Sequence, residues 1–316
     1  MKPIVTLTLN PTIDGASEAD VVRPIHKVRT RNERFDPGGG GINVSRVVRE
    51  LGGETLAIYL AGGATGPVLD ALLERRAVPR TVVPIKGHTR ISQTVFETSS
   101  GLEFRFVPEG PRIAPDEAQR CLETLAHSDC DWLVASGSLP RGLDAGFYAT
   151  VGAQARAKGA RFVLDTSGDA LRETLAGGGV FLCKPSQGEF ESLVGRKLEP
   201  GELEREAAAL VASGKVTLLA ITLGHEGAVL VDGDGAFRLP ALPVEARSAV
   251  GAGDSFVAAM TLGLATGRSA REAFVMGLAA GTAAVLTPGS DLCRREDFER
   301  LHVQATRAAA EASGGA

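Results

Sequence analysis

Aromatic residues are scarce in this chain, and it has no excess of positive charge. Trp, Tyr and Phe make up 5% of the 316 residues, which argues against a platform for stacking nucleic-acid bases. The net charge of −4 gives no basic excess that would attract nucleic acid or an anionic membrane. No apolar run reaches the ~18 residues of a membrane span, and the strand-like N-terminal stretch lacks the apolar segment of a signal peptide. We therefore expect a cytoplasmic globular protein without nucleic-acid or membrane partners.

Several common site motifs are also missing. The four cysteines form no C-x-x-C pair and have no histidines at metal-binding spacing, so reduced thiols are expected and a zinc centre is not. The chain has no G-x-x-x-x-G-K-[ST] phosphate loop and no G-x-S-x-G nucleophile motif. No G-x-G-x-x-G follows the first strand-like segment, which argues against a dinucleotide oxidoreductase.

Strand-like and helix-like patterns alternate along most of the chain. Strands are expected at 3–9, 54–60, 79–84, 131–135, 161–165, 180–183 and 217–223, with a hairpin turning at 232–235. Helices are expected at 42–51, after Gly66, at 115–127, 145–158, 253–266, 269–286 and 296–312. This alternation predicts an α/β fold in which helices sandwich a mainly parallel sheet.

Two β-rich segments, 12–35 and 88–107, contain no helix pattern and do not fit that sheet. We expect them to form a small β lid, inserted into a main domain made of 1–11, 36–87 and 108–316. Ligands of an open parallel sheet collect beyond the carboxyl ends of its strands. The loops at these ends are rich in glycine, notably at 38–41 and 61–66.

The stretch Gly251-Ala252-Gly253-Asp254 precedes an apolar helix pattern. Free N–H groups and the positive end of the helix dipole make such a start an anion site. Asp254 stands where a carboxylate would orient a hydroxyl beside a bound phosphate, as in a kinase acting on an alcohol. An ordinary helix start with an aspartate near its cap would give the same pattern.

A run of four glycines, Gly38 to Gly41, precedes Asn43 and a second helix pattern. Each glycine lowers the stability of a regular helix or strand by roughly 0.5–1 kcal/mol. Four in a row therefore suggest a functional reason, so we interpret the run as a sugar- or phosphate-binding loop, with a flexible loop as the alternative. Asp14, just after the first strand, would accept hydrogen bonds from sugar hydroxyls or serve in a turn.

Charged residues mark two further places. Lys27, Arg90 and Arg105 lie in the expected lid, where a cation would clamp a substrate phosphate or would simply be solvated. Elsewhere, Lys184 follows a strand and would contact phosphate, while Glu189 and the strand-end Asp165 would hold Mg²⁺ through water. Ordinary helix-start charges would explain this second group equally well.

The glycine-rich motifs at 37–43 and 250–254 together resemble the two signatures of the PfkB/ribokinase family of sugar kinases, and the resemblance runs from Thr6 to Cys293. The segments 38–43, 61–66 and 104–107 are most similar to its minor bacterial 6-phosphofructokinase branch. The 1-phosphofructokinases and tagatose-6-phosphate kinases are the neighbouring branches. The former usually have a lysine among the glycines, and this chain has none.

The resemblance implies a ribokinase-like fold, ATP and Mg²⁺ as cofactors, and a homodimer held through the lid. It makes Asp254 the base and Gly251, Ala252 and Gly253 the anion hole. It assigns the sugar phosphate to Asp14, Lys27, Gly39, Gly40, Asn43, Arg90 and Ser138, and ATP to Lys184, Ser186, Thr222, Gly224 and Gly227. It places a monovalent cation, usually K⁺, at Ser248, Val250, Ala284 and Gly289.

Two departures from the family pattern are visible. Ser186 stands where the family commonly has Asn, although Glu189 is kept, and the cation loop differs at Thr287 and Asp291. The resemblance predicts transfer of the γ-phosphoryl group of ATP to a ketohexose phosphate, with fructose 6-phosphate as the leading acceptor. Fructose 1-phosphate and tagatose 6-phosphate are the alternatives, and a non-catalytic sugar-phosphate sensor is a further one. Since a free aspartate has a pKa of ~3.9, Asp254 is expected to accept the proton late in the reaction.

Overall fold

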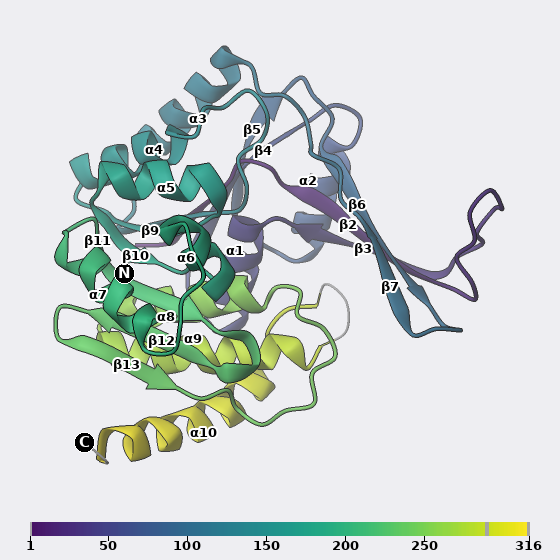
Figure 1. Ribbon diagram of the computed structural model, residues 1–316. Coiled ribbons are helices and arrows are strands. Elements are labelled where there is room, and N and C mark those ends of the chain that lie inside the picture. The colour runs from purple at the N-terminus through teal and green to yellow at the C-terminus, as the bar shows by residue number, and fades with distance from the viewer. Residues whose placement is uncertain (1, 288–290, 315–316) are drawn as a thin grey trace.

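The computed structural model describes residues 2–287 and 291–314, and its main body is an α/β sandwich (Figure 1). The central sheet has nine strands in the order β13-β12-β11-β10-β9-β8-β1-β4-β5. Its strands are β1 (Ile4–Thr8), β4 (Thr55–Gly62), β5 (Arg80–Ile85), β8 (Trp132–Ser136), β9 (Arg161–Asp165), β10 (Val180–Cys183), β11 (Val216–Thr222), β12 (Ala228–Asp232) and β13 (Gly235–Leu239). All neighbours pair in parallel except at the β11-β12-β13 edge, where the expected hairpin adds antiparallel strands.

Helices cover both faces of this sheet because its strands are apolar on both sides. One face packs against α1 (Gly40–Glu50), α8 (Ala252–Ala265), α9 (Ala270–Val285) and α10 (Arg295–Gly314). The other packs against α3 (Pro115–His127), α4 (Phe147–Ala157), α5 (Gly168–Gly177), α6 (Gln187–Val194) and α7 (Glu202–Ala212). Helix α2 (Gly66–Arg75) closes a smaller cluster over β4, and the short 3₁₀ helix η1 spans Gly224–Glu226. The predicted sandwich is confirmed.

Helices α5 and α7 were not predicted. Helix α5 is a short segment between Ser167 and Gly178, and the glycines at both of its ends resemble a loop. Helix α7 has a sequence rich in Glu, Ala and Leu, all good helix formers, so its signal was present.

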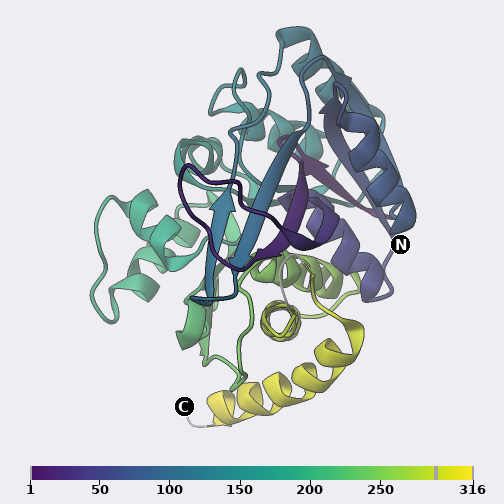
Figure 2. The ribbon, with the colours of Figure 1, turned by 90° about the vertical axis from the view of Figure 1, so that its right-hand side faces the viewer.

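Strands from the two β-rich segments form a separate four-stranded sheet in the order β3-β2-β6-β7. These strands are β2 (Thr12–Ala19), β3 (Arg31–Gly38), β6 (Arg90–Glu97) and β7 (Leu102–Phe106). Strand β3 continues past the boundary expected at residue 35 and leads directly into α1. The small sheet projects from the main body, and the turned view shows its strands passing in front of it (Figures 1 and 2).

Candidate active site

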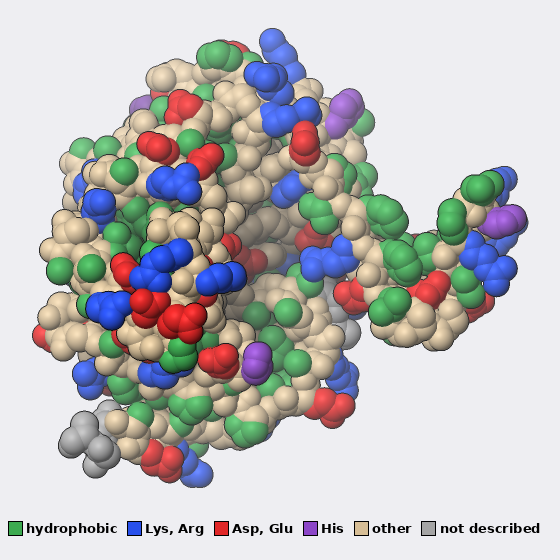
Figure 3. All heavy atoms as spheres, in the orientation of Figure 1, with side chains coloured by type: hydrophobic (Ala, Val, Ile, Leu, Met, Phe, Trp, Pro, Cys, Tyr) green, Lys and Arg blue, Asp and Glu red, His purple; other side chains and the backbone are tan. Residues whose placement is uncertain are grey.

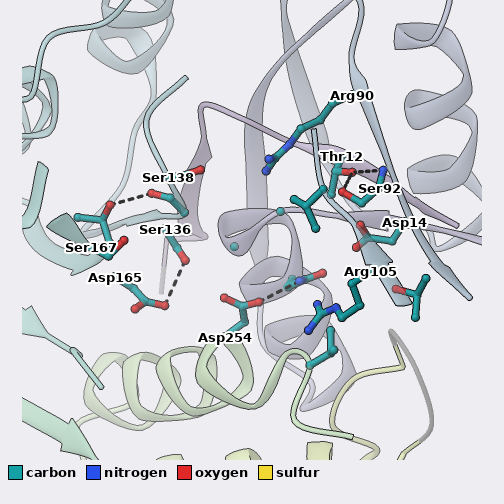
Figure 4. A pocket seen from close by; sticks show the side chains of 18 of the residues that line it. Thr12, Asp14, Arg90, Ser92, Arg105, Ser136, Ser138, Asp165, Ser167 and Asp254 are labelled. Carbon is teal, nitrogen blue, oxygen red and sulfur yellow. Dashed lines mark hydrogen bonds between the residues drawn. The ribbon is translucent and has the colours of Figure 1, made fainter. Parts of the chain in front are cut away.

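A cavity of about 350 Å³ lies where the small sheet meets the carboxyl ends of the central strands. Figure 3 shows a hollow at the base of the projecting sheet, and Figure 4 shows the side chains around the cavity. From the predicted set, the cavity is lined by Asp14, Gly39, Gly40, Asn43, Arg90, Arg105, Ser138, Asp165, Glu189, Val250 and Asp254. Residues from segments far apart in the chain therefore share one site.

The floor of the cavity is the first turn of α8. Gly251 caps this helix with a positive φ of 73°, a conformation that favours glycine. No described residue accepts a hydrogen bond from the N–H groups of Gly251, Gly253 or Asp254. Unpaired N–H groups at a helix N-terminus are the donors that an anion requires.

Asp254 is held by the other glycine-rich motif. Its Oδ2 accepts a hydrogen bond of 2.9 Å from Asn43 Nδ2, and Arg46 Nη1 donates to Asn43 Oδ1 over 3.2 Å. Burial, assisted by the nearby negative charge of Asp165, raises the pKa of Asp254 to about 6. The carboxylate is therefore a better proton acceptor than the free aspartate on which the sequence-based expectation rested.

The four-glycine run is a tightly packed turn rather than a flexible loop. Gly39 has a φ of 112° and is the N-cap of α1. A Cβ on Gly41 would lie 2.6 Å from the Leu7 carbonyl oxygen of β1, so no larger residue fits there. The run lets α1 begin directly against the central sheet and aims Asn43 at Asp254.

The small sheet supplies the opposite wall. Alternate residues of a strand face the same side, and Arg90, Ser92 and Thr94 of β6 all line the cavity. Arg90 donates to the carbonyl oxygens of Asn10 and Pro108 over 2.9 and 3.0 Å, while its buried Nε has no acceptor. Burial raises the pKa of Asp14, against the opposing effect of Arg46 and Arg90.

A third group lies at the ends of β9 and β10. Lys184 Nζ is 3.2 Å from Asp165 Oδ1, and a Cβ on Gly253 would be 3.3 Å from the same Nζ. Burial alone would lower the pKa of Lys184. The negative charges of Asp165 and Glu189 have the larger combined effect, so the pKa of Lys184 is raised. Lys184 therefore stays cationic beside the helix start that would bind phosphate.

Ser186 and Glu189 form a capping box at the start of α6. The Glu189 carboxylate accepts from both the Ser186 N–H and hydroxyl, over 2.7 and 2.8 Å. The serine at the family's Asn position is thus explained locally as a helix cap. Thr222, the last residue of β11, forms a bridge with Ser186, and Gly224 and Gly227 follow it in the chain. None of these three residues lines the cavity.

Lys27, Ser248 and Ala284 do not line the cavity, whereas Val250 does. Lys27 is exposed on the loop between β2 and β3 and does not line the cavity of the single chain. Ser248 and Val250 lie in a loop whose Arg247 and Ser248 N–H groups donate to the Val285 carbonyl at the end of α9, next to Ala284. Gly289 falls outside the described residues.

Sequence reasoning missed several polar residues of the cavity. These are Thr12, Ser92, Thr94, Ser136, Thr166 and Ser167. Strand-end position would have signalled Ser136 and its neighbours, whereas Thr12 and Ser92 meet only because β2 and β6 pair in parallel. Their hydroxyls lie 2.9 Å apart.

The part of the chain that the structure describes holds no group of three or more His, Cys, Asp or Glu side chains suited to a metal ion. Asp165 and Glu189 both line the cavity, but Asp165 already pairs with Lys184, and Glu189 already accepts a hydrogen bond in the cap of α6. They fit a hydrated ion that arrives on another ligand better than a dedicated metal cage. Within the described ranges, no helix has the length and apolar character needed to cross a membrane.

Curated relatives resemble the chain along nearly its whole length. The ATP-dependent 6-phosphofructokinase isozyme 2 of Mycobacterium tuberculosis is 43% identical over 94% of this chain and 88% of its own. The protein of the same name from Escherichia coli is 40% identical over 97% and 100%. The 1-phosphofructokinase of Borreliella burgdorferi is 32% identical over 95% and 97%.

Solved structures agree with this result. Phosphofructokinase-2 from E. coli in complex with fructose-6-phosphate has a TM-score of 0.91 at 39% identity, covering 97% of this chain and 100% of its own. The same protein in complex with potassium has a TM-score of 0.93 at 40% identity and the same coverage, and a tetrameric inhibited form is also known. The model of the pfkB family carbohydrate kinases matches residues 7–297. The chain belongs to the PfkB family of carbohydrate kinases.

Proposed function

We propose that this protein transfers the γ-phosphoryl group of ATP to the 1-hydroxyl of fructose 6-phosphate, giving fructose 1,6-bisphosphate. The observation that carries the proposal is the arrangement of one cavity. Asp254 and the free N–H groups of α8 form its floor, and Arg90 and Arg105 stand on the opposite wall. A phosphate bound at the wall would leave the far end of the sugar at Asp254.

The reaction follows from these groups. Asn43 orients the Asp254 carboxylate, which accepts the hydroxyl proton as the new bond to phosphorus forms. The N–H groups of Gly251, Gly253 and Asp254, together with Lys184, stabilise the charge that develops on the transferring group. Asp14 and Ser138 hold the sugar hydroxyls.

ATP would lie along Lys184, Ser186, Thr222, Gly224 and Gly227, beyond the α8 start. Magnesium would arrive on the ATP phosphates, neutralise their charge and be held through water by Asp165 and Glu189. A potassium ion is proposed between the Ser248–Val250 loop and the end of α9, because the Ser248 N–H donates to the carbonyl of Val285, the residue after Ala284.

The division into a main domain and a β lid belongs to the same proposal. The small sheet has its own strands, and the face away from the cavity exposes Phe35, Ile91 and Phe106. Figure 3 shows hydrophobic side chains along this projecting part. Exposed apolar surface of this kind favours pairing with a second copy, so we propose a homodimer held through the lid.

A cytoplasmic location would suit the proposed substrates and the four buried free cysteines.

A panel of hexose phosphates tested for ADP release decides the acceptor. We expect fructose 6-phosphate to be used with the highest kcat/KM. Preference for fructose 1-phosphate would favour the second candidate, 1-phosphofructokinase, which the B. burgdorferi relative supports. Binding of a sugar phosphate without ATP consumption would favour the non-catalytic sensor.

A further inference from the structure

A second cavity, of about 560 Å³, is lined by the C-terminal half of α1, whereas Asn43 of the catalytic site lies in the first turn of that helix. It opens between α1 and the segment that leads into α10, where the Arg295 N–H donates to Glu50 Oε1 over 3.0 Å. Figure 2 shows this segment passing the end of α1. The two cavities have no lining residue in common.

Positive charge predominates in this second cavity. Its charged lining consists of four arginines, Arg46, Arg49, Arg76 and Arg294, and two acids, Glu50 and Asp291. The excess of cations is notable in a chain whose net charge is −4. Like charges gathered in one concave place repel one another unless an anion joins them.

The acids are too few to neutralise these arginines. Asp291 is 3.5 Å from Arg294 and 3.8 Å from Arg34, and therefore serves two cations. Glu50 is engaged by a backbone N–H, and Arg76 pairs with Asp36. The Arg49 side chain is exposed and makes no ion pair or hydrogen bond with any described residue.

Arg46 connects this cavity to the catalytic one. Its Nη1 donates to the Pro37 carbonyl and to Asn43 Oδ1, over 2.8 and 3.2 Å. Its other nitrogens have no acceptor among the described residues and are not fully enclosed. Burial lowers the pKa of Arg46, because a guanidinium removed from water lacks a full set of partners. An anion in the second cavity would supply those partners.

We propose that the cavity lined by Arg46, Arg49, Arg76 and Arg294 binds a small phosphate-bearing anion at a site separate from the sugar and nucleotide. Guanidinium groups match phosphate oxygens in bidentate geometry. The lining contains no aromatic residue on which a nucleobase would stack, so the ligand is recognised by its phosphate rather than by a base. Arg46 links the bound anion to Asn43, and Asn43 in turn donates the hydrogen bond that positions Asp254.

Calorimetric titration with pyrophosphate tests the site, comparing the full-length protein with the double variant Arg49→Ala/Arg294→Ala. Both side chains are exposed, so the fold should survive their removal. Each lost charge-assisted hydrogen bond contributes about tenfold to affinity. We expect one binding event to weaken at least about tenfold in the variant. Binding in the catalytic cavity is common to both proteins, so the outcome does not depend on the proposed function.

The matched control is Arg120→Ala/Arg172→Ala, which removes the same charge from exposed ion pairs on α3 and α5. We expect the control to bind pyrophosphate like the unaltered protein. Inorganic phosphate should compete for the same event, whereas chloride at the same ionic strength should compete far more weakly. Superimposable isotherms for the double variant and the unaltered protein would overturn the proposal. Equal loss in the control, or equal competition by chloride, would show general charge attraction and would overturn it as well.

Discussion

Asn43 and Asp254 are 211 positions apart in the chain, yet Asn43 Nδ2 donates to Asp254 Oδ2 over 2.9 Å. Asn43 lies in the first turn of α1 and Asp254 in the first turn of α8, and each helix begins at a glycine-rich turn. The glycine-rich turns before α1 and α8 therefore form one site together. One presents free N–H groups, and the other fixes the orientation of the carboxylate beside them.

Replacing Asp254 with Asn should lower kcat by at least ~10²-fold, the usual range for losing a general base. The amide keeps the shape of the carboxylate and can still accept from Asn43, so ATP binding should be retained. Steady-state kinetics and nucleotide titration check both points. Asp232→Asn, in the β12–β13 turn, is the control and should have normal turnover. Near-normal turnover of the Asp254 variant would remove this residue from its proposed role.

The same substitution should stabilise the ligand-free protein at high pH. The pKa of Asp254 rises from 3.8 to about 6 on folding, so the unfolded chain releases this proton first. The contribution of Asp254 to the stability of the unaltered protein therefore falls by up to about 3 kcal/mol as pH rises from about 4 to 6, and no further above that. The Asp254→Asn variant does not lose this stability, because asparagine carries no titrating proton. Urea unfolding should show a gain at pH 8 that shrinks towards pH 4, and a gain independent of pH would contradict the assigned pKa.

Arg90→Ala should weaken the use of fructose 6-phosphate and affect free fructose little. Charge-assisted hydrogen bonds contribute about 1.5–3 kcal/mol each, or roughly 10- to 100-fold in kcat/KM. Arg141→Ala is the control, because Arg141 contacts the neighbouring Gly110 carbonyl but does not line the cavity. Equal use of fructose and fructose 6-phosphate by the unaltered enzyme would refute a phosphate clamp in the small sheet.

Sedimentation should show a dimer that Phe106→Asp converts to monomers. Phe106 is 57% exposed on β7, on the face of the small sheet away from the cavity. Val303→Asp, on α10, introduces the same charge at a side chain of similar exposure, 53%, and should leave the dimer intact. A monomer at micromolar concentration before any substitution would exclude the lid as a dimer clasp.

The sequence was informative where a residue's neighbours along the chain determine its environment. The glycine-rich turns, the strand-end Asp165 and Lys184, and the two helix-free segments could all be located from local pattern. The glycine run was predictable, but its main reason was not. Gly41 is required by the Leu7 carbonyl, which comes close only after β1 and α1 have packed together.

What depends on distant packing could not be predicted. The raised pKa of Asp254 requires burial beside Asp165, and the cavity position of Ser92 requires parallel pairing of β2 with β6. The position of Lys27 near the sugar stays a prediction. A resemblance placed it near the sugar, whereas in the single chain it lies on an exposed loop.

The most direct test of the account is to identify the product formed from fructose 6-phosphate and ATP. ³¹P and ¹³C NMR of the reaction mixture would show which hydroxyl is phosphorylated, and an enzyme-coupled assay would count the ADP released. The account predicts fructose 1,6-bisphosphate and ADP in equal amounts, with Asp254→Asn forming at least ~10²-fold less in the same time. No ADP release with fructose 6-phosphate, or phosphorylation at a hydroxyl other than the one on C1, would contradict it.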